Sequence, residues 1–359
     1  MESSLNCFIQ IKNAQRIAII THKNADTDAL ASSISLKRII KDNFEKPEKK
    51  YVVDIFTDSI EFNKKDDYII QNDEFNKQTC DNYDLAIALD CTNRDRMGIY
   101  DKIFKKATDT LNIDHHSTND RFAKNNIIAS NCSSTSEIIF ILFIQINKLK
   151  CSAGTMSVIY SGIITDTNNL SQNMGPKTFD VINILNKLTA KEGIELEQVR
   201  NYYFKSNTKE QNALLAHALS SLVYSDDGKI AIMKIEKEDF EKTNTTMNDT
   251  LGIVDYAINT QGVEIGIIFI NQGDDTYHVS LRSKNNINVG IIAQQMGGGG
   301  HTKIAAFQTK QSDNFKYIRT KLIDICEKEI IKTSDLEDGD LTNLFSDMFA
   351  EDQKNDDNK

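Results

Sequence analysis

The polar triplet Asp114, His115 and His116 comes directly after the apolar run 110–113. That run is typical of a short buried strand, so the three side chains stand at a strand end. Imidazole nitrogens bind transition metals, and a neighbouring carboxylate can orient an imidazole ring. The chain has only six histidines. A His-His pair alone would more often be a pair of surface histidines, but the upstream sequence changes that interpretation.

A second polar group, His22, Asp26 and Asp28, follows the apolar run 16–20 and precedes apolar residues at helical spacing from Ala29 onward. These side chains therefore lie in a strand-to-helix loop. The simplest alternative makes one aspartate a helix N-cap, which is the commonest role for aspartate at this position. An N-cap explains one carboxylate. It does not explain two carboxylates with a histidine just before them.

Two further apolar stretches, 83–89 and 161–164, lead into Asp90 and Asp166. In open α/β sheets, ligands bind outside the carboxyl ends of the strands, so side chains at these ends converge. The candidate metal ligands are six oxygen or nitrogen donors without a cysteine, which suits Mn²⁺ or Mg²⁺ better than structural zinc. They are His22, Asp26, Asp28, Asp90, His115 and Asp166.

In order and spacing, these motifs resemble those of the DHH phosphoesterases. The stretch Gly297–Ala306 resembles the signature of the DHH-associated substrate domain, and Val279–Ser283 resembles the arginine-serine strand that accompanies it. The nano-RNase and pAp phosphatase branch is the most similar. The resemblance implies an α/β fold, with a parallel-sheet N-terminal DHH domain, a smaller C-terminal α/β domain and the active site in the cleft between them.

The resemblance further implies two divalent ions, Mn²⁺ first, with Mg²⁺ or Co²⁺ as alternatives. Asp114 would orient the histidines, and His116 would face the substrate, where it stabilises the phosphoryl charge or aids the leaving group. The reverse assignment of His115 and His116 stays open. The two implied ligand sets share Asp90 as a bridge: His22, Asp26 and Asp90 for one ion, and Asp28, Asp90, His115 and Asp166 for the other.

The C-terminal glycine run lies between a helical pattern at 289–296 and His301. Four glycines alone would suggest a flexible loop, but glycine N–H groups can also form an anion-binding nest. An arginine can grip phosphate with two hydrogen bonds. We expect five residues to bind the distal phosphate or nucleotide of the substrate: Arg282, Ser283, Gly299, Gly300 and His301.

Arg96 is a further substrate candidate, although its spacing to Gly98 also suits a loop turn. His217 and His278 lie on ordinary helix and strand patterns, and we interpret them as structural.

The composition is that of an ordinary protein long enough for two domains, with 359 residues and 40% hydrophobic residues. The N-terminus lacks the basic and apolar regions of a secretory signal. The most apolar stretch, 138–146, is too short to cross a bilayer, so no membrane association is expected. The six scattered cysteines have no CxxC spacing, which favours reduced thiols in a cytoplasm.

The formal net charge of −10 is concentrated at the C-terminus, where Ser334–Lys359 holds nine acidic residues and two lysines. The remaining chain is nearly neutral and has no basic stripe, which argues against long duplex nucleic acid and favours short RNA oligonucleotides or mononucleotides. The acidic tail is expected to be disordered. A partner-docking motif at 341–349 and a homodimer are both left open.

We expect four segments: a catalytic domain at 1–190, a helical connector at 191–225, a substrate-binding domain at 226–333 and an acidic tail at 334–359. The first domain alternates strands near 16–21, 51–57, 84–90 and 110–114 with helices near 28–42, 134–148, 155–165 and 177–189. The second has strands near 229–235, 263–271, 276–282 and 304–309, and helices near 249–258, 288–296 and 313–332.

The resulting functional hypothesis is a metal-dependent phosphoesterase that hydrolyses nano-RNA to mononucleotides and pAp to AMP. A phosphodiesterase for cyclic dinucleotides, or for their linear dinucleotide products, uses the same core and is the alternative. A DHH-class pyrophosphatase is not expected to carry the glycine run. A metal-free binding module is disfavoured because all six candidate ligands are present.

Overall fold

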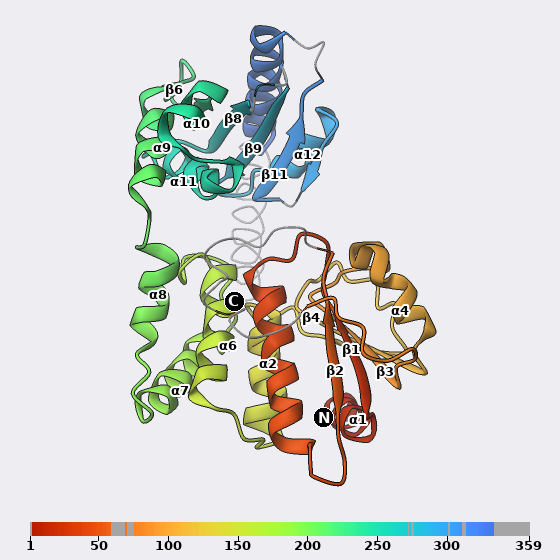
Figure 1. Ribbon diagram of the computed structural model, residues 1–359. Helices are drawn as coiled ribbons and strands as arrows, with labels where there is room; N and C mark the ends of the chain where they lie inside the picture. Colours follow the sequence, from red (N-terminus) through yellow and green to blue (C-terminus); the bar gives the residue numbers. More distant parts are fainter. Residues whose placement is uncertain are drawn as a thin grey trace, which may run out of the picture. The chain divides into compact units, whose positions relative to one another are not determined.

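The computed structural model describes residues 2–58, 69, 75–271, 273, 276–300, 302–310 and 314–333. By its internal contacts the chain divides into two compact units, Met1–Ser206 and Asn207–Lys359 (Figure 1). The predicted acidic tail, with its candidate docking motif at 341–349, lies outside the described residues, as does His301.

A parallel five-stranded sheet, in the order β2-β1-β3-β4-β5, forms the centre of the first unit. The four strands predicted from apolar runs are present. The fifth, β5, was not predicted, because its sequence Asn-Asn-Ile-Ile has only two apolar residues and lies at the sheet edge. The strands are β1 (Arg16–Ile20), β2 (Val52–Phe56), β3 (Leu85–Leu89), β4 (Asp109–Asp114) and β5 (Asn125–Ile128).

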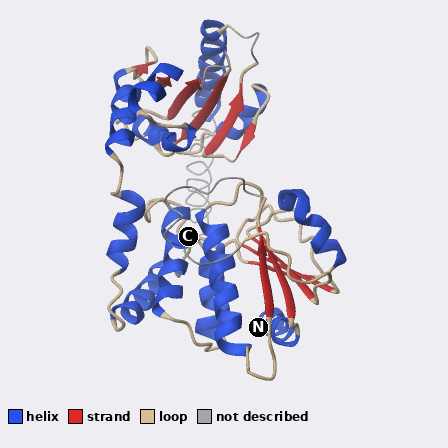
Figure 2. Cartoon of the chain, viewed as in Figure 1, coloured by secondary structure: helices blue, strands red, loops and turns tan. Residues whose placement is uncertain are grey.

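Helices cover both faces of this sheet (Figure 2). Along β1, Ile17 and Ile19 belong to one apolar core together with residues of α1, α2, α5 and α6, while Ala18 and Ile20 belong to another with residues of α4. This alternation explains the continuous apolar run, because a strand covered on both faces needs no polar positions. The helices are α1 (Glu2–Asn13), α2 (Thr27–Phe44), η2 (Arg94–Tyr100), α4 (Asp101–Lys106), α5 (Thr135–Ile139), η3 (Phe140–Ile146), α6 (Ala153–Asp166), α7 (Thr178–Ala190) and α8 (Leu196–Phe204).

The helix predicted near 134–148 consists of two parts. It is α-helical as α5 and then continues as the π-helix η3. Because all strands of the first sheet are parallel, the loops after β1, β3 and β4 leave from the same edge. The predicted ligand loops are therefore neighbours although they are up to about a hundred residues apart in sequence.

The second unit has a six-stranded mixed sheet in the order β10-β11-β9-β8-β7-β6, in which only β7 and β8 are parallel among the described pairs. The predicted strands are present, and the two-residue strands β6 and β10 were not predicted. The strands are β6 (Val223–Tyr224), β7 (Ile230–Ile235), β8 (Ile265–Asn271), β9 (Tyr277–Ser283), β10 (Gly299–Gly300) and β11 (Ile304–Gln308).

Two apolar cores lie on the two faces of this second sheet. One contains residues of α12 and of the helix at 315–333, and the other contains residues of α9 and α11. None of the helices described in either unit is long and apolar enough to span a membrane. The helices bounded here are α9 (Lys209–Ser220), α10 (Lys237–Thr243), η4 (Met247–Thr250), α11 (Ile253–Ile258) and α12 (Val289–Gln295).

Candidate metal centre and substrate residues

The loop between β1 and α2 carries His22 and Asp26, and the first turn of α2 carries Asp28. Asp26 is the N-cap of α2, and its Oδ1 accepts a hydrogen bond from the backbone N–H of Ala29 at 3.0 Å. Its other oxygen, Oδ2, lies 3.8 Å from Nε2 of His22. Asp26 is thus both the cap that the simplest interpretation expected and a carboxylate facing the histidine.

The ring of His22 is oriented by its own loop. Its Nδ1 lies 2.7 Å from the carbonyl oxygen of Lys23, so Nδ1 carries the proton that it donates. Its Nε2 then faces the carboxylates, 3.5 Å from Oδ2 of Asp90. A histidine held in this way through one nitrogen presents the other as a metal ligand.

Asp90 follows β3 directly and adopts a left-handed backbone conformation, with φ of 59°. This conformation is costly for a residue with a side chain and clusters at functional sites. The side chain is only 3% exposed. Its Oδ2 faces His22, and its Oδ1 lies 3.5 Å from Nε2 of His115. One buried carboxylate therefore faces histidines from two different loops.

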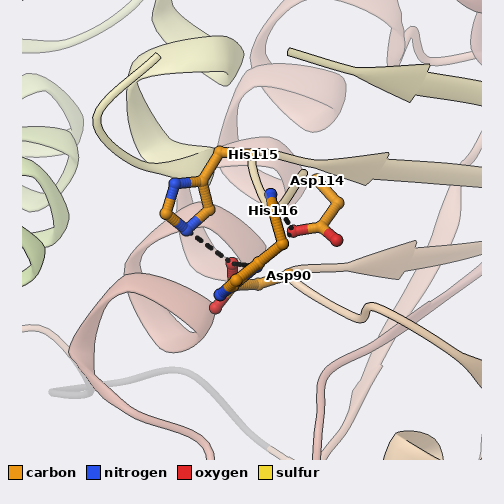
Figure 3. Close-up of side chains that lie close together, drawn as sticks. All are labelled: Asp90, Asp114, His115 and His116. Atoms are coloured by element: carbon orange, nitrogen blue, oxygen red, sulfur yellow. Dashed lines mark hydrogen bonds and ion pairs between the residues drawn. The ribbon is translucent and has the colours of Figure 1, made fainter. Parts of the chain in front are cut away.

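Figure 3 shows the triplet at the end of β4, where both histidines lie against Asp90. The Nε2 of His115 also lies 3.4 Å from Oδ2 of Asp166. The Nδ1 of His116 instead lies 2.7 Å from Oδ1 of the fully buried Asp114. His115 therefore points to the other candidate ligands, while His116 is held by its own aspartate.

Asp166 is the last residue of α6, a helix that lies beside α2 (Figure 1). Its Oδ2 is buried and makes no hydrogen bond to a described residue. The packing of α6 against α5 and α2 requires Gly162, because a Cβ there would clash with the side chain of Ser136 and would lie 2.6 Å from Oδ1 of Asp28. The glycine thus allows α6 to bring Asp166 to the centre.

Crowded carboxylates perturb the acid–base behaviour of this centre. Burial, followed by the charges of Asp90 and Asp26, raises the pKa of Asp28 to about 8. Burial, followed by the charge of Asp28 and of the other carboxylates of the cluster, also raises the pKa of Asp166 well above its ordinary value. Burial opposes the charge of Asp90 as well, but the hydrogen bond from His22 and the charges of the nearby histidines outweigh it and lower its pKa.

The pKa values of His22 and His116 are also raised, which for a histidine favours the charged form. Burial disfavours the charged form of His22, but hydrogen bonds to Asp26 and Asp90 prevail and raise its pKa to about 10. Burial likewise disfavours charged His116, but its hydrogen bond to Asp114 prevails and raises its pKa to about 9. A cluster in which carboxylates and imidazoles perturb each other this strongly is typical of a functional site.

The donor atoms fit divalent cations. Three groups have ligand atoms that all lie within 4.8 Å of one another. Carboxylate oxygens and imidazole nitrogens, with no sulfur among them, suit Mn²⁺. The buried Oδ2 of Asp166 accepts no hydrogen bond from a described residue, and a bound cation would give it a partner. The groups are His22, Asp26 and Asp90; Asp28, His115 and Asp166; and Asp90, Asp114, His115 and His116.

Sequence reasoning overlooked two residues that touch this centre. Asn119 donates to Oδ2 of Asp114 at 2.6 Å and to Oδ1 of Asn112 at 2.8 Å. Thr135 donates to both Asp28 and Asp90. The available signal was the polar run 131–137, where a serine three residues before Glu137 is typical of a helix start. Such a signal predicts the helix but not its contacts.

Arg96, the remaining candidate of the first unit, is exposed at the start of η2. Its carbonyl oxygen accepts from the backbone N–H of Lys23 at 2.7 Å, which joins the loop after β3 to the loop after β1. Gly98 has φ of 58°, and a Cβ there would lie 2.1 Å from Oδ2 of Asp58. The glycine is therefore required by the turn itself.

In the second unit, Arg282 lies on β9 and is paired with Asp255 of α11, with 3.4 Å between Nε and Oδ1. The hydroxyl of Ser283 lies 2.7 Å from the carbonyl oxygen of Ile287 and 3.2 Å from that of Thr302. The serine proton is thus used to hold the loop that follows β9.

The glycine run has a clear structural role. Gly299 and Gly300 form β10 and pair with β11. Gly300 has φ of +148°, and a Cβ there would lie 2.5 Å from the Cα of Ala305. Gly300 is therefore required for close strand approach, whereas a Cβ at Gly299 would meet no atom within 4 Å. Of the two histidines interpreted as structural, His217 lies 3.1 Å from Oδ1 of Asp239, and burial lowers the pKa of His278.

Comparison with known protein families agrees with this site. The DHH family N-terminal domain matches residues 16–163, and the DHHA1 domain matches residues 227–328. The chain therefore belongs to the DHH family and carries both of its domains. It is a metal-dependent phosphoesterase that uses divalent ions.

Among similar curated proteins is a probable bifunctional oligoribonuclease and PAP phosphatase, NrnA, from Streptococcus mutans. It is 29% identical over 293 residues, which are 81% of this chain and 89% of that protein. The bifunctional oligoribonuclease and PAP phosphatase NrnA of Bacillus subtilis is 25% identical, over 87% of this chain and 95% of that protein. A cyclic-di-AMP phosphodiesterase, GdpP, from Geobacillus thermodenitrificans is 27% identical over 83% of this chain but only 45% of that protein.

Among solved structures, an exopolyphosphatase-related protein from Bacteroides fragilis has a TM-score of 0.74 at 19% identity, over 94% of this chain and 98% of that one. RecJ from Thermus thermophilus, in complex with Mn²⁺, has a TM-score of 0.52 at 11% identity, over 91% of this chain and 54% of that one. At these identities the likeness establishes the fold.

Proposed function

We propose that this chain hydrolyses short oligoribonucleotides to mononucleotides and pAp to AMP. The observation that carries the proposal is the position of Asp90, whose two oxygens face His22 on one side and His115 on the other at 3.5 Å each. A carboxylate shared in this way is the usual means of holding two ions at the spacing that phosphoester hydrolysis requires.

The proposed ligands divide into two sets around Asp90. Mn²⁺ is the proposed ion at both positions, with Mg²⁺ or Co²⁺ as alternatives, because oxygen donors combine here with imidazole. Two bound ions would lower the pKa of a water and neutralise phosphate charge. Their ligands would be His22, Asp26 and Asp90 for one, and Asp28, Asp90, His115 and Asp166 for the other.

His116 is the proposed substrate-facing residue of the first unit. Its hydrogen bond to Asp114 fixes the ring and, against the effect of burial, raises its pKa to about 9. In its protonated form the ring is positively charged. It can stabilise the negative charge of the scissile phosphoryl group or give a proton to the leaving oxygen. Asp114 supports this role by holding the ring.

The second unit is proposed to bind the part of the substrate that does not react. Arg282 is the principal residue: its pairing with Asp255 through Nε and its hydrogen bond from Nη1 to the carbonyl oxygen of Leu281 fix the guanidinium group, whose remaining N–H groups would grip a phosphate. Arg96 is the proposed contribution of the first unit. The other substrate-binding residues, proposed from the sequence, are Ser283, Gly299, Gly300 and His301. The catalytic segment 1–190, the connector 191–225 and the substrate segment 226–333 remain our proposed division.

The share of each relative's length that this chain matches favours hydrolysis of short RNA and pAp over hydrolysis of cyclic dinucleotides. The two oligoribonucleases match over 89% and 95% of their own lengths, whereas the cyclic-di-AMP phosphodiesterase matches over 45% of its length. Hydrolysis of cyclic dinucleotides or of their linear products is the second candidate function, which that last relative supports. Nucleotide substrates and six free cysteines fit a cytoplasmic protein.

A substrate panel with Mn²⁺ tests the proposal. It compares pAp, a dinucleotide, a short RNA pentamer, a cyclic dinucleotide and pyrophosphate under one set of conditions. We expect the highest kcat/KM on pAp and the short linear RNAs. Preference for the cyclic dinucleotide would support the second candidate, and hydrolysis of pyrophosphate alone would overturn both.

A further inference from the structure

Thr135, the first residue of α5, contacts one proposed ligand from each of the two ligand sets. Its backbone N–H donates to Oδ2 of Asp28 at 2.7 Å, and its hydroxyl donates to Oδ1 of Asp90 at 2.9 Å. The residue is fully buried, so water does not compete for these bonds.

The neighbouring backbone completes the hold on Asp28. The N–H of Ser136 donates to Oδ1 of Asp28 at 3.0 Å, so each oxygen of this carboxylate accepts a hydrogen bond from one backbone N–H. The rotation of the Asp28 side chain is thereby fixed by α5. The rotation of Asp90 is fixed differently, since its bond comes from the Thr135 side chain rather than from the backbone.

A buried carboxylate anchors the start of α5. Glu137 is fully buried, and its Oε2 accepts from the backbone N–H of Ser133 at 2.9 Å and from its hydroxyl at 2.5 Å. The same oxygen accepts from the hydroxyl of Thr178, at the start of α7, at 2.8 Å. Ser134 caps the helix by accepting from the N–H of Glu137. Thr135 is thus held between two fixed neighbours.

We propose that Thr135 is a positioning residue that sets the orientation of the Asp28 and Asp90 carboxylates relative to each other. This inference rests on the proposed two-metal centre. Ordinary side-chain rotation would let either carboxylate turn its oxygens away from a cation. Five acidic side chains also repel one another here, and hydrogen-bond donors reduce that repulsion. Thr135 thereby keeps the two proposed metal sites formed, at the separation that a substrate bound to both ions requires.

The test removes the hydroxyl and keeps the backbone. Thr135→Val retains the N–H to Asp28 and the side-chain shape but removes the donor to Asp90. Thr135→Ser retains both donors. Thr189→Val is the matched control, because Thr189 is also fully buried in the first unit and its hydroxyl donates within its own helix, to the carbonyl oxygen of Asn186. Thermal unfolding of each variant shows that it is folded.

The readout is Mn²⁺ binding to the full chain by isothermal titration calorimetry, followed by kcat and KM on pAp. We expect Thr135→Val to weaken Mn²⁺ binding by about 10–100-fold, the usual effect of losing a partner of a metal ligand. Thr135→Ser and Thr189→Val should bind Mn²⁺ as the wild type does. If Thr135→Val fails to fold, Thr135→Ala removes the same hydroxyl without placing a methyl group against Asp90.

Three results would count against either the positioning role or the metal centre. Wild-type affinity for Mn²⁺ in a folded Thr135→Val protein would overturn the positioning role while leaving the two-metal centre intact. A wild-type chain that binds no Mn²⁺ would overturn the proposed centre itself. Equal weakening in Thr135→Val and Thr189→Val would show a general loss of packing, and would also refute the role assigned to Thr135.

Discussion

Replacement of Arg282 by alanine tests the division of labour between the two units. The side chain is 23% exposed and is paired with Asp255, itself 31% exposed. Burial raises the pKa of Asp255 although Arg282 opposes this effect. Because the Asp255 side chain is partly exposed, water can solvate its carboxylate when the arginine is removed, which limits the cost to folding. The main loss in Arg282→Ala should therefore be in substrate binding.

The size of this loss follows from the contact that the arginine is proposed to make. A hydrogen bond to a charged group contributes about 1.5–3 kcal/mol. At 1.36 kcal/mol for each factor of ten, this equals a loss of about tenfold to 150-fold in kcat/KM. A contact made equally in the ground and transition states changes KM and leaves kcat nearly unchanged. The effect on pAp should therefore appear in KM.

The assay compares the wild type and Arg282→Ala on pAp and on p-nitrophenyl phosphate, a small ester without a distal phosphate. The ester should be hydrolysed nearly as fast by the variant. Arg319→Ala is the control, since this arginine lies on the helix at 315–333, which packs on the opposite face of the second sheet from α11. Equal loss on both substrates would place Arg282 in the chemistry or in folding and would refute the assignment.

Three further outcomes are expected. Asp90→Ala should lower kcat on every substrate by more than about 100-fold, because even the partners of ligands are worth 10–100-fold; residual activity of several per cent would place the bridge elsewhere. Activity lost to a chelator should return better with Mn²⁺ than with Ca²⁺, which tolerates looser coordination, and equal rescue would contradict the two-metal proposal. Hydrogen bonds from Arg16 lower the pKa of Asp84 against burial, so this carboxylate stabilises the fold above its unfolded pKa of about 3.9 and the stabilisation is lost as pH falls through the lowered value. The Tm difference between wild type and Asp84→Asn should thus shrink on acidification, and a constant difference would contradict this.

The strands and the candidate ligands could be predicted from the sequence because both predictions depend on local patterns. The buried parallel strands are continuous apolar runs, and each candidate ligand comes within a few residues of such a run or of a helix end. The edge strand β5 lacked that pattern, since one of its residues is exposed, the others are only partly buried, and two of the residues are polar. The two-residue strands β6 and β10 are too short to give any periodic signal.

The contacts of the metal centre were beyond sequence reasoning for a different reason. Thr135 and Asp90 are separated by 45 positions, and Thr135 and Asp28 by 107. Whether a buried hydroxyl donates to a distant carboxylate depends on how α5 packs on the sheet, which no local pattern encodes. Gly162 is similar, because its need for a hydrogen in place of a Cβ arises where α6 meets the side chains of Ser136 and Asp28.

Asp26 illustrates why competing interpretations of one residue need not exclude each other. The N-cap interpretation and the ligand interpretation were alternatives at the level of sequence, yet Oδ1 caps α2 while Oδ2 faces His22. The cap fixes the rotation of the carboxylate, and so it aims the second oxygen. An Asp26→Asn variant would keep an oxygen for the cap while replacing the charged ligand atom with an amide. It should therefore retain the stability of α2 but weaken Mn²⁺ binding, and Mn²⁺ affinity equal to that of the wild type would show that capping was the only role of Asp26.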